Sequence, residues 1–159
     1  MIKILFVCHG NICRSPMAEF IFRDMIDKRG IRNISCASAA TSTEEIWGGS
    51  GNPIYPPAKR VMKEHSIPFD EHYAVQIKKS DYDKYDFIIG MDRMNIRNIL
   101  YITGGDPDKK VCTLLSFTGC SADVSDPWYT HDFETAYRDI TAGCEALVKY
   151  LSESGKTDE

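Results

Sequence analysis

The sequence predicts an α/β domain whose core is a largely parallel sheet of four strands. Short apolar segments of strand length alternate along the chain with segments whose apolar residues recur at helical spacing, which is typical of this class. The chain has 159 residues, 43% of them hydrophobic and 26% charged, and we expect them to form one domain over 1–159. A chain of this length buries enough surface to fold around its own core.

The first half of the chain opens with a strand, a turn and a helix. Residues 2–8 are apolar apart from Lys3, as in a buried strand. A polar turn follows as far as Arg14. Ser15 and Pro16 then offer a favoured N-cap and a favoured first helical residue for a helix ending at Arg29-Gly30. The next expected elements are a strand over 34–40, a long loop over 41–57 and a short helix over 58–65.

The second half continues the alternation of strands and helices. The expected elements are a helical turn over 80–85, a strand over 87–91, a helix from Asp92 to about Tyr101, a strand over 111–115 and a helix over 133–151. Residues 152–159 are polar, and we expect them to fray.

Charge and cysteine content exclude several classes of protein. A net charge of −4 disfavours general binding to nucleic acid or to an anionic membrane, and no apolar run approaches a membrane span. The six cysteines follow no leader sequence, so we expect a cytoplasmic protein with reduced thiols. The sequence has no Cys-x-x-Cys pair and no other metal-ligand spacing, and we therefore expect neither a metal nor another cofactor.

The turn between the first strand and the first helix has the composition of an anion-binding site. It reads Cys-His-Gly-Asn-Ile-Cys-Arg-Ser over residues 8–15. Gly10 and Asn11 tolerate left-handed backbone angles, which lets successive amides turn inward, and the helix N-terminus adds its positive dipole. Cys8 would face this electropositive hollow as a thiolate, although a cysteine considered alone is more often a small packed residue. The expected phosphate-binding residues are His9, Gly10, Asn11, Ile12, Cys13 and Arg14.

This turn closely resembles the phosphate loop of the low-molecular-weight protein tyrosine phosphatases. The resemblance starts with Val-Cys-His-Gly-Asn-Ile-Cys-Arg-Ser-Pro and continues through Ser38–Thr41, Ile89–Asp92 and Asp126–Tyr129 to the terminal helix. It implies a flavodoxin-like, three-layer fold and hydrolysis of phosphotyrosine in proteins, or of small aryl phosphates, through a phosphocysteine. It also implies a monomer or weak dimer.

The resemblance assigns four catalytic roles. Cys8 would attack phosphorus while Arg14 and the loop amides hold the phosphoryl oxygens, and Ser15 would donate a hydrogen bond to the sulfur. Asp126, held extended by the proline that follows it, would be the general acid and base. Asp92 is a rival carboxylate better suited to capping a helix, and Asp123 is a weaker candidate.

Further residues of the resemblance would support the loop and line the cleft. Asn11, Ser38 and His72 match a polar network that stiffens the phosphate loop, although His72 could also be an ordinary surface residue. Trp128 and Tyr129 would form an aromatic wall, Trp128 in place of one tyrosine of the usual pair.

Two positions near the cleft leave alternatives open. Where the family commonly has an aromatic residue, this chain has Glu44, so either Trp47 takes over that role or Glu44 alters specificity. Cys13 would be a redox partner that protects Cys8 through a reversible disulfide, or else a packed thiol.

Three other functions are weighed against phosphotyrosine hydrolysis. Thiol-dependent arsenate reductases carry a cysteine pair just after the third strand, which Cys112 and Cys120 do not match. Phosphoarginine phosphatases tend to have Thr where this chain has Ile12. A non-catalytic phosphate-binding module or a phosphocysteine carrier would not need Asp126.

Overall fold

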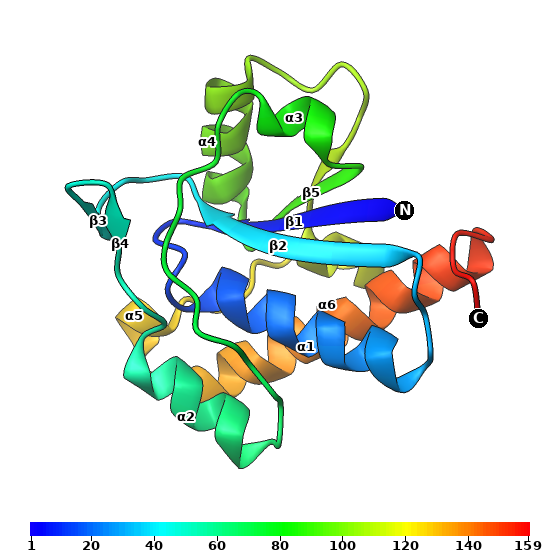
Figure 1. Cartoon of the computed structure of the whole chain (residues 1–159), viewed down its shortest axis with the longest axis horizontal. Coiled ribbons are helices and arrows are strands. Elements are labelled where there is room, and N and C mark those ends of the chain that lie inside the picture. Colours follow the sequence, from blue (N-terminus) through cyan, green and yellow to red (C-terminus); the bar gives the residue numbers. More distant parts are fainter.

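The centre of the protein is a four-stranded parallel sheet. In the computed structural model, which describes residues 1–159, the strands lie in the order β2-β1-β5-β6 (Figure 1). Their bounds are β1 Ile2–Cys8, β2 Ile34–Ala40, β5 Phe87–Gly90 and β6 Val111–Thr113. Strand β1 pairs with β2 on one side and with β5 on the other. This order confirms the predicted four-stranded, flavodoxin-like sheet.

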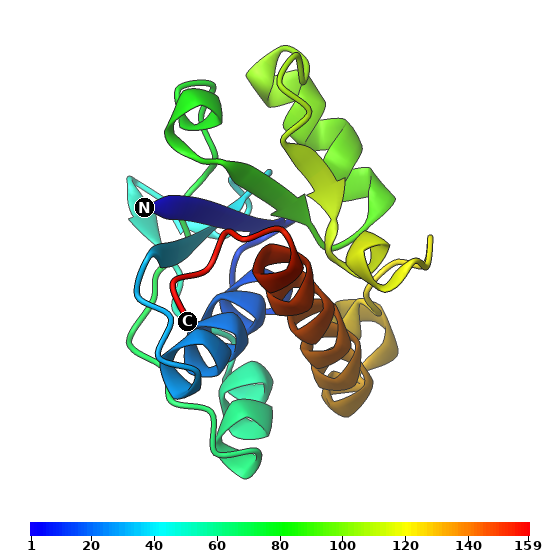
Figure 2. The ribbon, with the colours of Figure 1, turned by 90° about the vertical axis from the view of Figure 1, so that its right-hand side faces the viewer.

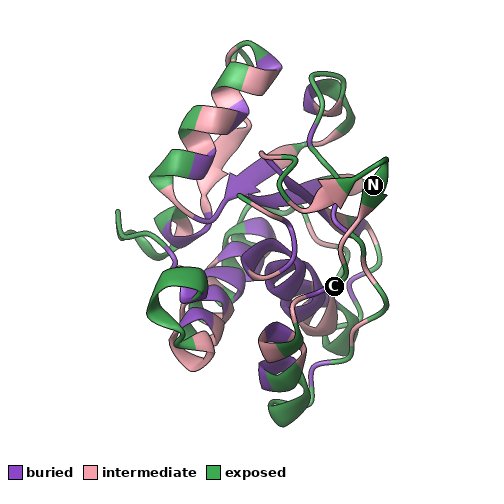
Figure 3. Cartoon of the chain, turned by 90° about the vertical axis from the view of Figure 1, so that its left-hand side faces the viewer, coloured by how far each residue is buried: buried purple, intermediate pink, exposed green.

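Helices cover both faces of the sheet and give the predicted three layers (Figure 2). On one side lie α1 Arg14–Lys28, α2 Pro56–Glu64 and α6 Phe133–Glu153, and on the other lie α3 Asp81–Lys84 and α4 Arg93–Thr103. The core is accordingly split into a large cluster under α1 and α6 and a smaller one that includes Ile99 of α4. Figure 3 shows buried residues concentrated in the central strands and in α1.

The alternation of side chains along β1 decides which way Cys8 points. Ile4, Phe6 and Cys8 belong to the large cluster, whereas Leu5 and Val7 belong to the small one, because successive residues of a strand face opposite sides. Cys8 therefore faces the layer that contains α1, at the carboxyl end of the central strand.

Several element bounds differ from the sequence predictions. Helix α1 begins at Arg14 with Cys13 as N-cap, so Ser15 is not the cap, and its hydroxyl is free to contact another group. The expected long loop after β2 contains a small antiparallel hairpin, β3 Ile46–Trp47 and β4 Ser50–Gly51. Two glycines with positive φ form the turn of this hairpin, and glycine adopts such angles without strain.

Two further differences lie in the second half. The fourth strand, β6, ends at Thr113, and the chain then forms a 3-10 helix, η1 Leu114–Thr118. The polar segment before α6 contains a single helical turn, α5 Pro127–Thr130.

The chain after α6 turns back toward the start of β2. The amide of Arg32 donates to Asp158 Oδ1 at 2.9 Å, and Asn33 Nδ2 donates to the carbonyl of Lys156 at 2.9 Å. None of the helices combines the length and the apolar character that a membrane crossing requires.

Candidate active site

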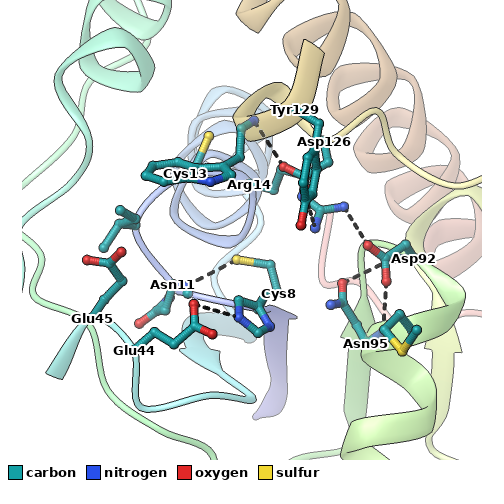
Figure 4. A pocket seen from close by; sticks show the side chains of 15 residues that line it. Cys8, Asn11, Cys13, Arg14, Glu44, Glu45, Asp92, Asn95, Asp126 and Tyr129 are labelled. Carbon is teal, nitrogen blue, oxygen red and sulfur yellow. Dashed lines mark hydrogen bonds and ion pairs between the residues drawn. The ribbon is translucent and has the colours of Figure 1, made fainter. Parts of the chain in front are cut away.

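The turn after β1 wraps its backbone around the sulfur of Cys8. The amide of Asn11 points at Cys8 Sγ from 3.3 Å (Figure 4). The amide of Ser15 points at the same sulfur from 3.4 Å, and Ser15 Oγ lies 3.0 Å from it. Cys8 is 3% exposed and lines the pocket that opens above it. Hydrogen-bond donors directed at one sulfur favour its anionic form, so the geometry suits a thiolate.

The backbone strain of this turn falls on Asn11 rather than on Gly10. Asn11 has a φ of 59°, in the left-handed region, whereas Gly10 is not among the residues with positive φ. A Cβ atom at Gly10 would lie 3.2 Å from the Cγ of Glu45, so the Glu45 side chain would have to move by a few tenths of an ångström to accept it. The expectation that both residues supply left-handed angles is therefore half right.

The side chain of Asn11 holds the strained turn through four partners. Its Nδ2 donates to the hydroxyls of Ser15 at 2.9 Å and Ser38 at 3.0 Å. Its Oδ1 accepts from His72 Nε2 at 2.9 Å and from the amide of Val75 at 3.1 Å. Every donor and acceptor position of the amide is thus used, which fixes its orientation. The structure brings together Asn11, Ser38 and His72, as the sequence predicts.

Glu19 extends this network and was missed as a site residue. Ser38 donates to Glu19 Oε1 at 2.7 Å, and Arg23 donates to Glu19 Oε2 at 2.8 Å. If the helix began at Pro16, Glu19 would be an acid in its first turn, where the helix dipole stabilises a negative charge. Helix α1 begins at Arg14, however, and has no acidic residue in its first turn. The spacing of four residues between Ser15 and Glu19 was the available signal, because residues i and i+4 share one helix face. Burial lowers the pKa of His72, and the nearby Glu19 carboxylate acts in the opposite direction.

Arg14 is buried and joins three elements beside the phosphate loop. Its Nη1 donates to Asp92 Oδ2 at 2.9 Å and to the carbonyl of Val124 at 3.2 Å, and its Nη2 donates to Asp126 Oδ2 at 3.3 Å. Burial by itself lowers the pKa of Arg14, but the negative charges of Cys8, Asp126 and Asp92 outweigh it and raise the pKa. Arg14 is therefore a fixed cation at the edge of the pocket.

The three candidate carboxylates occupy different places. Asp126 caps α5, accepting from the Trp128 amide at 3.1 Å, and lines the pocket. Asp92 caps α4 through the Asn95 amide at 2.7 Å, as predicted, and also lines the pocket next to Arg14. Asp123 accepts from the Arg93 amide at 3.1 Å and is not part of the lining.

The pocket has a volume of about 490 Å³, with the phosphate loop as its floor. Asp126, Trp128 and Tyr129 of α5 and the loop before it form one wall. Glu44 lines another part and pairs with His9 Nε2 at 3.0 Å. The pocket also includes three residues that the sequence did not indicate, namely Glu45, Met94 and Asn95.

Of two further residues predicted for the site, Trp47 lies outside the pocket and Cys13 lines it. Trp47 lies on β3, is 72% exposed and does not line the pocket, so of the two alternatives the structure brings only Glu44 to the cleft. Cys13 lines the pocket with Cys8, and both are free thiols. Burial, followed by the charge of Cys8, raises the pKa of Cys13, so Cys13 stays protonated.

Comparisons with known proteins agree along the whole chain. The model of the family "Low molecular weight phosphotyrosine protein phosphatase" matches residues 3–157. The chain is 40% identical over 156 residues to the low molecular weight protein-tyrosine-phosphatase YfkJ of Bacillus subtilis, covering 96% of this chain and 97% of YfkJ. It is 34% identical over 162 residues to PtpA of Staphylococcus aureus, covering 100% of this chain and 99% of PtpA.

The crystal structure of YfkJ superposes with a TM-score of 0.90 at 38% identity, covering 97% of this chain and 96% of that one. The fold and the pocket define a phosphate-binding α/β protein with a cysteine at the carboxyl end of its central strand. The chain belongs to the low-molecular-weight phosphotyrosine protein phosphatase family. Its relatives are protein-tyrosine-phosphatases, which are phosphoric monoester hydrolases, and a cysteine-based mechanism is general in the family.

Proposed function

We propose that Cys8, Arg14, Ser15 and Asp126 carry out phosphotyrosine hydrolysis in this protein. The observation that carries the proposal is the surroundings of the Cys8 sulfur, which meets two backbone N–H donors and the Ser15 hydroxyl within 3.4 Å at the floor of the pocket. These contacts stabilise negative charge on the sulfur, which favours the thiolate both as the nucleophile of the first step and as the leaving group of the second. Arg14 and Asp126 stand at the same pocket, in contact with each other.

In the first step, the thiolate of Cys8 attacks phosphorus in line with the phenolic oxygen. The S–P bond forms as the P–O bond breaks, and the departing oxygen takes a proton from Asp126. The amides of residues 9–14 and the guanidinium of Arg14 hold the three remaining oxygens, over which negative charge spreads. The phosphoryl group competes with Asp126 for Arg14 Nη2, which frees the carboxyl group to face the leaving oxygen.

In the second step, the phosphocysteine is hydrolysed. Asp126, now a carboxylate, takes a proton from a water molecule, and the water oxygen attacks phosphorus. The S–P bond breaks, Cys8 leaves as a thiolate, and inorganic phosphate is released. Ser15 supports this departure because its hydroxyl lies 3.0 Å from the sulfur and can donate to the negative charge.

The proposed substrates are tyrosine-phosphorylated proteins and small aryl phosphates. Trp128 and Tyr129 are 55% and 81% exposed on the pocket wall, where they can stack on the phenyl ring of the substrate. Thiol-dependent arsenate reduction has less support, because neither Cys112 nor Cys120 lines the pocket. Because the reaction needs a reduced Cys8, we place the enzyme in the cytoplasm. We expect it to act as a monomer or weak dimer.

We also propose that Cys13 protects Cys8 from irreversible oxidation. Cys8, as the thiolate, attacks a peroxide oxygen first, giving a sulfenic acid and a hydroxide ion, which takes a proton from solvent. The Cys13 thiol then displaces the hydroxyl group as a second water, and a disulfide forms. Thiol reductants return both cysteines to their active state.

Two substitutions test the catalytic roles. Cys8→Ser should abolish measurable hydrolysis of an aryl phosphate, and Asp126→Asn should lower kcat/KM by about 10² to 10⁴. Cys120→Ser and Asp123→Asn are matched controls outside the pocket and should keep the parent rate. Substantial turnover by Cys8→Ser would refute the role of Cys8 as nucleophile. A full rate for Asp126→Asn would show that another residue is the general acid.

A further inference from the structure

Tyr55 contacts both sides of the candidate site, although it has no role in the chemistry described above. It is the N-cap residue of α2, half-buried, and its backbone N–H donates to the carbonyl of Ile12 in the phosphate loop at 2.8 Å. Its ring centroid lies 5.4 Å from that of Trp128, with the two planes inclined by 52°. One residue thus joins the phosphate loop to the helical turn that follows Asp126.

The segment that carries Asp126 has few other supports. Helix α5 is a single turn of four residues, which is too short to be stable without packing. Just before it, the amide of Val124 donates to the carbonyl of Met91 at 2.9 Å, and the amide of Ser125 donates to Asp139 Oδ2 at 3.0 Å. Arg14 also holds this segment through the carbonyl of Val124 and the carboxylate of Asp126. The packing of the residues after Asp126 adds to these contacts, and Trp128 among them is 55% exposed.

The ring of Tyr55 is well placed to provide that support. Phe133, the first residue of α6, packs against it with centroids 5.9 Å apart and planes inclined by 35°. Pro56 and Pro57 follow it directly and restrict the backbone. Both ring pairs fall in the separation range in which aromatic contacts are favourable. The phenolic oxygen of Tyr55 has no hydrogen-bond partner in the protein, so the ring alone makes these contacts.

We propose that Tyr55 is a positioning residue that holds Asp126 over the phosphate loop by packing its ring against Trp128. The proposal rests on the proposed role of Asp126 as general acid. If the ring is lost, α5 is free to shift while the backbone hydrogen bond from Tyr55 to Ile12 remains. Protonation of the leaving group then suffers, whereas phosphate binding and attack by Cys8 do not.

The test compares two aryl phosphates that need the acid to different extents. Phenyl phosphate releases a basic phenolate that must be protonated, whereas nitrophenyl phosphate releases a stable anion that needs little help. For Tyr55→Leu we expect kcat/KM to fall about tenfold more on phenyl phosphate than on nitrophenyl phosphate, because a loss of stacking on Trp128 would affect both substrates alike. Tyr55→Phe keeps the ring and should restore the parent ratio of the two rates. Tyr55→Met serves the same purpose if Tyr55→Leu does not fold.

Each substitution is also made together with Asp126→Asn. With the acid removed, Tyr55→Leu should have almost no further effect on phenyl phosphate, because the positioned group is absent. Equal losses on both substrates, or the same loss with and without Asp126, would assign Tyr55 a purely structural role and overturn the proposal. If Asp126→Asn itself leaves the ratio of the two rates unchanged, the acid is wrongly assigned and the proposal fails with it.

Discussion

Replacing Asn11 tests whether the phosphate loop is held by one side chain. Asn11→Ala removes four hydrogen bonds while the residue must still adopt a φ of 59°. The hydroxyls of Ser15 and Ser38 keep other partners, but the amide of Val75 loses its only protein acceptor. At about 1 kcal/mol per hydrogen bond, reduced for the two hydroxyls, this loss is about 2–3 kcal/mol.

Backbone strain adds to that figure. Alanine in the left-handed region costs about 1 kcal/mol, whereas asparagine tolerates it and glycine adopts it freely. The total for Asn11→Ala is then about 3–4 kcal/mol of unfolding free energy. Asn11→Gly is the matched variant, because it loses the same hydrogen bonds without the strain, and it should be about 1 kcal/mol more stable than Asn11→Ala.

Urea unfolding measures the stability, and kcat/KM on an aryl phosphate measures the consequence for the site. Both variants should lose activity, because the amides of the loop no longer converge on one point. Asn11→Ala within about 0.5 kcal/mol of the parent would show that the network does not hold the loop. Equal stability of the Ala and Gly variants would show that the turn relaxes out of the left-handed region.

Three further predictions concern specificity, pH and oxidation. Glu44→Gln should reduce the preference for phosphotyrosyl peptides with a neighbouring Lys over those with a neighbouring Glu, measured as the ratio of the two kcat/KM values. The control Glu145→Gln, at an exposed position on α6, should leave this ratio unchanged. Although partial burial acts the other way, three hydrogen bonds hold the pKa of Asp106 below its ordinary range. The stability that the Asp106 carboxylate adds is present above about pH 3.9 and is lost as the pH falls through its folded pKa. The unfolding free energies of Asp106→Asn and the parent should therefore differ at neutral pH and converge in acid, and a difference that does not change with pH would refute this role. Cys13→Ser should lose the recovery of activity by thiol reductant after peroxide, and unchanged recovery would leave Cys8 without this partner.

The sequence predicts the sheet and the phosphate loop well because both depend on local patterns. An apolar strand, a turn containing Asn11 and a helix starting beside Arg14 are neighbours in the chain, so their geometry follows from backbone preferences. Helix α1 starts two residues earlier than predicted, because Ser15 resembles a cap and the actual cap residue, Cys13, makes no side-chain cap hydrogen bond.

What the sequence cannot predict is the pairing of groups that lie far apart in the chain. Asp92 looks like a helix cap and is one, but its second oxygen binds Arg14, 78 residues away. Trp128 and Tyr55, which pack against each other, are also far apart in the sequence, and no spacing rule links them. Exposure is also a tertiary property, which is why Trp47 was a reasonable candidate for the cleft although the hairpin carries it out to solvent.

The site combines groups fixed by strands with groups fixed only by contacts. Cys8 ends β1, and Asp92 follows β5 with one residue between them, so the adjacent parallel strands β1 and β5 bring both groups to the same edge of the sheet. Asp126 and His72 come from loops that no strand aligns. The first is tied to Arg14 and the second to Asn11, two residues of the same short turn. The phosphate loop therefore binds the anion and also positions the loop-borne groups, so a change in this turn should alter acid catalysis as well as binding.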